Sequence, residues 1–140
     1  MVFADAGVTD VTITRIPNYR IRVTLSDTVH RGDPIGQDAS GNWKGALATT
    51  GSVVQARLVA LQGGASGDVI EAVRGCRITG GRITGATGGN SIYAAEGGTA
   101  GVYTETKPST SGDADTVIGQ AVDATTLDIA CQSNPDSVAA

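Results

Sequence analysis

Short runs of alternating apolar and polar residues recur along this chain of 140 residues. Val11–Ile16 and Tyr19–Leu25 have the period-2 pattern of half-buried strands, and Pro17-Asn18 between them predicts a turn, and therefore a hairpin. Val53–Leu61 predicts a third, longer strand, because its apolar residues alternate with Gln and Arg. The same pattern predicts further strands over Val69–Arg74, Cys76–Ile78, Ser91–Ala94, Gly101–Thr104, Thr116–Val122 and Thr126–Ala130.

Glycine-containing turns separate these runs at fairly regular spacing, and no segment has a convincing helical period. This pattern predicts an all-β fold, a compact β-sandwich or β-barrel of short antiparallel strands with extended termini. We expect a single β domain over residues 11–131, an N-terminal arm over residues 1–10 and a C-terminal tail over residues 132–140.

Two segments share an order of turns and strands. Val29–Trp43 runs through a Gly-Asp turn, an apolar strand, a second turn and an aromatic residue that leads a strand, and Gly89–Tyr103 is similar. A longer apolar run follows each segment. Either the chain repeats one unit or two hairpins obey the same turn chemistry. The glycine-rich stretch Gly80–Gly89 is either a mobile loop or a set of tight turns with close backbone approach.

Composition and charge exclude several classes of function. The net charge is −4 and only two of the ten basic residues are lysines, which argues against nucleic acid as a partner. No apolar run approaches the ~20 residues that a membrane span requires. The first residues lack the basic and apolar regions of a signal peptide, so we expect synthesis in the cytoplasm without export.

Candidate catalytic chemistry is sparse. His30 is the single histidine, which excludes a two-histidine metal site, and its place beside a turn is typical of a solvated residue. The scattered aspartates are expected to cap turns, and Asp113 and Asp115 lack the spacing of a calcium loop. We therefore expect no enzyme, no cofactor, no metal and no small-molecule substrate. The rival is a small hydrolase that uses Asp33, Asp38 or Asp113.

Three other features have a structural and a functional interpretation. Arg31-Gly32-Asp33 spells an integrin-binding tripeptide, but Pro34 after it favours a rigid turn. Cys76 and Cys131 are expected to be buried reduced thiols, although a secreted protein would pair them. Arginine outnumbers lysine, and Arg20 and Arg22 share one strand face, opposite Tyr19, Ile21 and Val23. That face is either simply solvated or contacts an acidic protein surface.

Two stretches together resemble the capsid decoration (cement, or head-stabilising) proteins of tailed bacteriophages. In Val59–Cys76 an apolar strand ends in an Ala-Ser-Gly-Asp turn, and a Val-rich strand then closes with glycine. Gly89–Ile129 contains a glycine turn, an aromatic strand, an Ile-Gly-Gln-Ala strand and a final strand, as in the C-terminal half of such proteins. The resemblance covers roughly residues 29–130 and consists of small and apolar residues.

The resemblance implies a structural virion protein that binds the outer surface of the mature head. Its partner would be the major capsid protein, whose subunits it would bridge, often as a homotrimer, against the pressure of packaged DNA. The N-terminal arm either orders against the shell or a neighbouring protomer, by pairing as an added strand or by inserting Phe3 as an anchor, or it stays disordered. The alternative is another non-enzymatic structural module, such as a tail, fibre or adhesin β domain. The candidate residues for the capsid or protomer interface are Val2, Phe3, Val8, Arg20, Arg22, Arg77 and Arg82.

Overall fold

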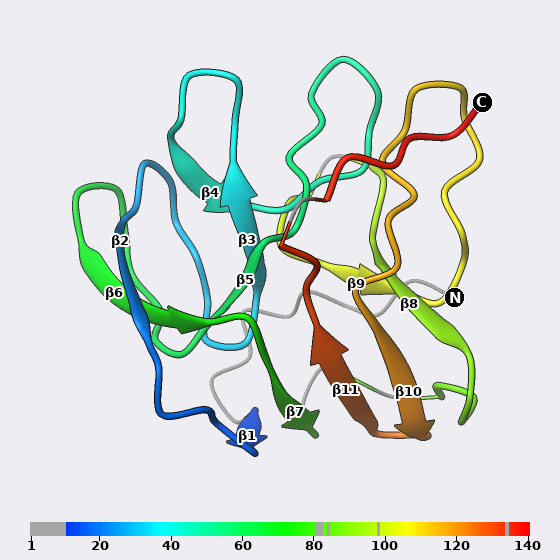
Figure 1. Ribbon diagram of the computed structural model, residues 1–140, viewed down its shortest axis with the longest axis horizontal. Coiled ribbons are helices and arrows are strands. Elements are labelled where there is room, and N and C mark those ends of the chain that lie inside the picture. Colours follow the sequence, from blue (N-terminus) through cyan, green and yellow to red (C-terminus); the bar gives the residue numbers. More distant parts are fainter. Residues whose placement is uncertain (1–10, 81–82, 84, 98, 134) are drawn as a thin grey trace.

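The computed structural model describes residues 11–80, 83, 85–97, 99–133 and 135–140. Within these residues the chain forms eleven strands, no helix and two antiparallel sheets, an arrangement compatible with a β-sandwich, so the all-β prediction is confirmed (Figure 1). One sheet has the order β2 (Ile21–Thr24), β6 (Val69–Val73), β5 (Leu58–Ala60), β3 (Pro34–Gln37) and β4 (Trp43–Gly45). The other has the order β1 (Thr12–Thr14), β7 (Gly75–Thr79), β11 (Thr126–Ala130), β10 (Gly119–Asp123), β8 (Ser91–Ala94) and β9 (Tyr103–Thr104).

The chain builds one strand arrangement twice. We call β2–β6 the first unit and β7–β11 the second unit. In each unit the first strand pairs with the fifth, and the fourth, second and third strands follow in that order across the sheet. The β3–β4 and β8–β9 hairpins occupy equivalent places and correspond to the two segments with the same order of turns. Of the two interpretations of those segments, the structure favours a repeated unit, with β1 added at the edge of the second sheet.

The predicted hairpin between the first two strands is wrong. β1 pairs with β7 and β2 pairs with β6, so the two strands lie in different sheets. The favoured two-residue hairpin turns need a positive φ at their first central residue, which Pro17 cannot adopt. Arg15 instead takes a left-handed conformation with a φ of 54°, and the link through Pro17 carries the chain to the other sheet.

Predicted strand lengths were too generous in two places. Of the run Val53–Leu61 only β5 belongs to a strand, and before it Val54 makes a single bridge to Leu47. Here the chain passes close beside β3, since a Cβ added to Gly36 would lie 1.9 Å from the carbonyl oxygen of Gln55. The run Thr116–Val122 similarly enters the sheet only at β10.

Two groups of buried apolar side chains stabilise the two sheets. The larger cluster draws on both units, with Val59 and Val73 from the first and Ile78, Ile92 and Leu127 from the second. The smaller cluster belongs to the first unit alone. Its buried members are Val23, Leu25, Val29, Ile35, Leu58, Ala60, Ile70 and Ala72. The centre of the first sheet, β5 with β3, is therefore buried on both faces, as the consecutive buried residues of these strands require, whereas β2 and β4 at its edges are partly exposed.

The first sheet curls round its own cluster until its two edges meet. Leu25, just after β2, forms a bridge with Trp43 at the start of β4. The backbone N–H of Ser26 donates to the carbonyl oxygen of Trp43 at 2.9 Å, and the Ser26 hydroxyl donates to the same oxygen at 3.0 Å. The second sheet has no such contact between β1 and β9 among the residues that the structure describes.

A buried hydrogen bond joins the two units. The hydroxyl of Tyr103, a fully buried side chain in β9, donates to the carbonyl oxygen of Gly32 at 2.8 Å. The half-buried Arg31 guanidinium donates to the carbonyl oxygen of Leu61, within the first unit, and to that of Val11, just before β1. Because Asp33 is also buried, the Arg31-Gly32-Asp33 tripeptide is an internal turn, and the turn interpretation is confirmed.

The C-terminal segment runs beside the loop that precedes β10. Ala114 and Val138 form an antiparallel bridge, and the Ala139 N–H donates to the Asp113 carbonyl oxygen at 2.7 Å. The Ser137 hydroxyl donates to the Asp115 carboxylate. In Figure 1 the C-terminus accordingly lies beside the orange loop at the upper right.

A candidate protein-binding surface

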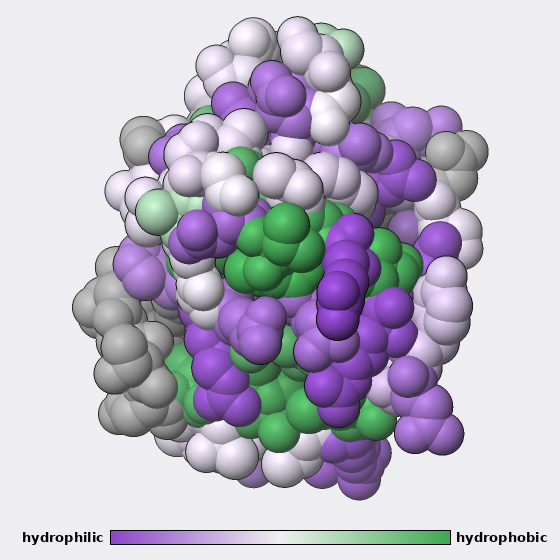
Figure 2. Space-filling view, turned by 90° about the vertical axis from the view of Figure 1, so that its left-hand side faces the viewer, coloured by the Kyte–Doolittle hydropathy of each residue, from purple (hydrophilic) through white to green (hydrophobic). Residues whose placement is uncertain are grey.

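Two of the predicted interface arginines lie on the outer side of the first sheet. Arg20 and Arg22 are exposed, and Arg22 stands opposite Glu71 in the β2–β6 register. Arg20 is 3.6 Å from the Glu71 carboxylate, in a pair whose side chains remain about 45% and 35% exposed. Figure 2 looks onto the side where β2 and β6 lie and shows hydrophobic residues among hydrophilic ones. Such an exposed pair stabilises little, because water screens it.

The expected alternation of β2 holds inside the strand and fails just before it. Val23 is buried and Arg22 exposed, as predicted. Tyr19, expected on the same side as Val23 and opposite the arginines, is instead 78% exposed. It precedes β2, in the link that carries the chain between the sheets, where the pleat of the strand does not set the direction of a side chain.

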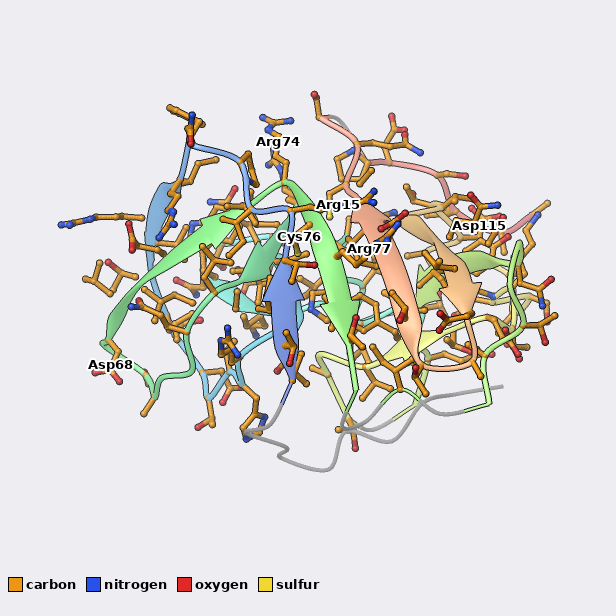
Figure 3. All side chains as sticks on the ribbon, turned by 90° about the horizontal axis from the view of Figure 1, so that it is seen from below. Arg15, Asp68, Arg74, Cys76, Arg77 and Asp115 are labelled. Carbon is orange, nitrogen blue, oxygen red and sulfur yellow. The ribbon has the colours of Figure 1, made fainter. Side chains whose placement is uncertain are left out.

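Arg77 is held by a partner within the chain. Its Nε and Nη2 donate to the two carboxylate oxygens of Asp128 at 2.7 and 2.9 Å, across the β7–β11 register. The Arg77 hydrogen bond, followed by the nearby charges of Arg77 and Arg15, lowers the pKa of Asp128. The same pair raises the pKa of Arg77. Figure 3 shows Arg15 and Arg77 close to each other beside this strand pair. The forked geometry gives Arg77 a structural role in the second sheet.

The other predicted interface residues, Val2, Phe3, Val8 and Arg82, lie outside the described residues.

The structure adds a surface that the sequence did not indicate. Two adjoining hollows of about 160 and 150 Å³ share Ile21 and Arg74 as lining residues. Pro17 and Tyr19 complete the first hollow, whereas Trp43 and Arg57 belong to the second. We call this set the Tyr19–Trp43 surface; its residues are Pro17, Tyr19, Ile21, Trp43, Arg57 and Arg74.

The backbone of the first sheet fixes the apolar part of this surface. Ile21 begins β2 opposite Ala72, and Trp43 begins β4 opposite Gln37. Both side chains are only half-buried, although they pack against the smaller cluster. The contact of Trp43 with Leu25 and Ser26 holds the two edges of the sheet together. An aromatic side chain on a rigid backbone loses little conformational freedom when a partner covers it.

The two arginines of this surface keep their positive charge unneutralised. Arg57 donates to the side-chain oxygen of Gln37 at 3.2 Å, and Arg74 donates to the Ser133 hydroxyl at 2.7 Å. Neither forms an ion pair with any carboxylate in the described part of the chain. Arg74 is the single residue between β6 and β7, and Figure 3 shows it pointing outward from that corner. Exposed tyrosine, tryptophan and arginine together are typical of the centre of a protein-binding surface.

Sequence reasoning missed this surface because its residues come from four distant segments. Ile21, Trp43, Arg57 and Arg74 meet only when β2 and β4 are brought to one side of a curled sheet. One signal was available in the sequence. Trp43 is the only tryptophan in a chain with 4% aromatic residues. It begins a short strand that is only partly buried.

The aspartates proposed for a hydrolase serve as turn caps or occupy buried positions. One carboxylate oxygen of Asp38 accepts the backbone N–H groups of Ser40 and Asn42, and the Asn42 bond is the main cause of its lowered pKa. Asp33 is buried and accepts the N–H of His30 at 2.9 Å. The expected role of these two aspartates in turns is confirmed. The His30 side chain is about 39% exposed and lies 3.7 Å from Asp33.

Cys76 and Cys131 are free and buried, as expected from the sequence. Cys76 stands opposite Ile129 in the β7–β11 register, and Cys131 lies two residues further along the chain. Burial is the main cause that raises the pKa of each thiol to about 12. Thiols with such a pKa are poor nucleophiles at neutral pH, because the thiolate is the reactive form.

Comparison with models of known protein families and with curated protein sequences finds no match to this chain. Among the described residues no helix has the length and apolar character to cross a membrane.

Proposed function

We propose that this chain is a capsid decoration protein of a tailed bacteriophage. It binds the exterior of the mature head, bridges subunits of the major capsid protein and stabilises the shell against packaged DNA. The observation that carries the proposal is the Tyr19–Trp43 surface, where two aromatic side chains and two unneutralised arginines lie together beside strands of the first sheet. The resemblance of Val59–Cys76 and Gly89–Ile129 to decoration proteins supports it.

The chemistry of this surface fits a protein partner that is acidic. Arg57 and Arg74 present planar guanidinium groups that bind carboxylates through paired hydrogen bonds. Tyr19 and Trp43 supply apolar area beside these charges. A single contact of this size binds weakly. On a symmetric shell, in a trimer that engages several capsid subunits at once, weak contacts sum to tight attachment.

The proposal is tested on virus particles purified by density gradient from the native source. Quantitative mass spectrometry then gives the ratio of this chain to the most abundant shell protein. A ratio near one to one, or a simple fixed fraction of it, is the expected result. A few copies per particle would assign the chain to a tail or fibre instead. Its absence from particles would contradict any virion function.

A further inference from the structure

One outer edge of the first sheet is paired at one end only. β2 is the outermost strand of that sheet, and Leu25, just after it, forms a parallel bridge with Trp43. Because β4 begins at Trp43, the residues of β2 before Leu25 have no residue of β4 opposite them. In the described part of the chain, the contact that closes the sheet therefore leaves the end of β2 with Ile21 and Arg22 open.

The hydrogen bonds of Glu71 in β6 show which way the backbone of Arg22 points. The Glu71 carbonyl oxygen accepts the Leu61 N–H at 2.9 Å, and the Glu71 N–H donates to the side-chain oxygen of Gln62 at 3.1 Å. Both backbone groups of Glu71 thus point away from β2. Arg22 stands opposite Glu71, so the two form a non-hydrogen-bonded pair of the antiparallel ladder. The N–H and C=O of Arg22 therefore point away from β6, and neither has a hydrogen-bond partner among the residues that the structure describes.

Positive charge flanks this open edge on both faces of the strand. Successive side chains of a strand point to opposite faces, so Arg22 and Ile21 lie on different sides of β2. The Arg22 guanidinium forms no ion pair within the described residues. On the other side, Ile21 lines both hollows of the Tyr19–Trp43 surface, where Arg57 and Arg74 have only neutral partners. A strand added at this edge would meet arginine on each of its faces.

We propose that an extended acidic segment of the major capsid protein pairs with the open edge of β2 as an additional strand. The segment belongs to the partner of the function proposed above, on which this assignment rests. Its backbone supplies the hydrogen bonds that Arg22 lacks, whereas a helix uses its own backbone groups internally. Its side chains alternate, with a carboxylate facing Arg22 on one side, and an apolar residue facing Ile21 and a carboxylate facing Arg57 and Arg74 on the other.

Hydrogen–deuterium exchange of the full chain tests this pairing at the Arg22 amide. The free chain should exchange the Arg22 amide fast and the Val23 amide, which faces β6, slowly. With the chain bound to expanded heads that lack it, the Arg22 amide should exchange at least about tenfold more slowly, read by mass spectrometry after quenching. Binding without this protection would overturn the added strand and leave the proposed function standing, whereas failure to bind heads would contradict both. Protection in a concentrated solution of the chain alone would overturn it in favour of a second copy as the occupant.

Arg22→Pro is the decisive variant, because it removes the outward N–H and none of the hydrogen bonds between β2 and β6. Proline is tolerated on an edge strand where the N–H faces solvent, and it favours the extended conformation that Ile21 already has. Arg22→Ala is the matched control, since it removes the same side chain and keeps the N–H. Arg22→Pro should bind heads about tenfold more weakly than Arg22→Ala, as expected for the loss of one backbone hydrogen bond. Equal binding of the two variants would overturn the pairing, and if Arg22→Pro does not fold, the exchange of the Arg22 amide in the parent decides.

Discussion

The two units have the same strand order, but their edge strands have different partners. The first unit curls until β2 and β4 meet through Leu25 and Trp43, and it encloses a small apolar cluster of its own. The second unit stays open, shares the larger cluster with the first, and pairs its first strand, β7, with β1. Unpaired strand edges invite association, so each unit needs a way to cover one. The same topology therefore has two forms. The first unit is curled, with edges that meet at Leu25 and Trp43, and it carries the Tyr19–Trp43 surface, whereas the second unit is open and pairs with the N-terminal strand β1.

The largest effects on stability are expected from equivalent cavities in the two apolar clusters. Ile35→Ala creates a cavity in the smaller cluster, and Ile78→Ala creates one in the larger cluster. Both side chains are fully buried. Each should lower the free energy of unfolding by about 2–5 kcal/mol. Urea unfolding should be followed by the fluorescence of Trp43, which reports on the first unit, and by circular dichroism, which reports on both.

Because the larger cluster joins the units, both signals should shift together in both variants. If Ile35→Ala shifted only the fluorescence transition, the units would fold independently and the shared cluster would not couple them. Arg22→Ala, at an exposed position of the same sheet, is the control and should change stability by no more than about 0.5 kcal/mol.

A second prediction concerns the bond between the units. Tyr103→Phe removes the hydroxyl that donates to Gly32, and leaves a buried carbonyl without that donor. The free energy of unfolding should fall by about 1–2 kcal/mol, measured by urea titration. Tyr93→Phe in β8 is the matched control, since Tyr93 is also in the second unit. An equal loss in both variants would argue that the Tyr103 bond has no special part in joining the units.

The smallest effect is expected from the ion pair of the second sheet. The folded-state pKa of Asp128 lies below its ordinary value of 3.8, mainly because Arg77 donates to it. The stability that this pair contributes is therefore present above that ordinary value and is lost as the pH falls through the folded-state pKa. Asp128→Asn should flatten this acid-induced loss below about pH 4, measured as urea midpoints across the acid range. Asp68→Asn, in the first unit, should leave the Asp128 contribution in place.

The strands could be predicted from the sequence much better than their pairing. The sequence pattern predicted the bounds of Ser91–Ala94 and Thr126–Ala130, although burial does not alternate along them, and in Cys76–Ile78 the alternation of apolar residues does follow burial. It misplaced the partner of the first strand, because pairing depends on where Arg15 and Pro17 direct the chain, and no pattern of apolar residues records that. The repeated order of turns indicated a repeated unit. It could not show that β2 and β7 occupy equivalent places in the two sheets.

The candidate surface was predictable only in its residue types. The excess of arginine predicts either a solvated face or a contact with an acidic protein surface, and the sequence cannot show which arginines have acidic partners within the chain. Arg77 has Asp128 across the sheet and Arg20 has Glu71, whereas Arg57 and Arg74 have neutral partners. These relations depend on strand register and on the corner between β6 and β7, which are properties of the folded chain.

The central claim is that the Tyr19–Trp43 surface attaches this protein to a phage head. The most direct measurement is co-sedimentation of the purified chain with expanded heads that lack it, with bound copies counted by mass spectrometry. The doubly substituted Tyr19→Ala/Arg74→Ala chain should lose most of its binding while it keeps the parent's unfolding midpoint. A Val122→Ala/Lys107→Ala chain, altered at exposed positions outside this surface, should bind like the parent. Undiminished binding of the Tyr19→Ala/Arg74→Ala chain would contradict the assignment of this surface, and failure of the parent chain to bind heads would contradict the function.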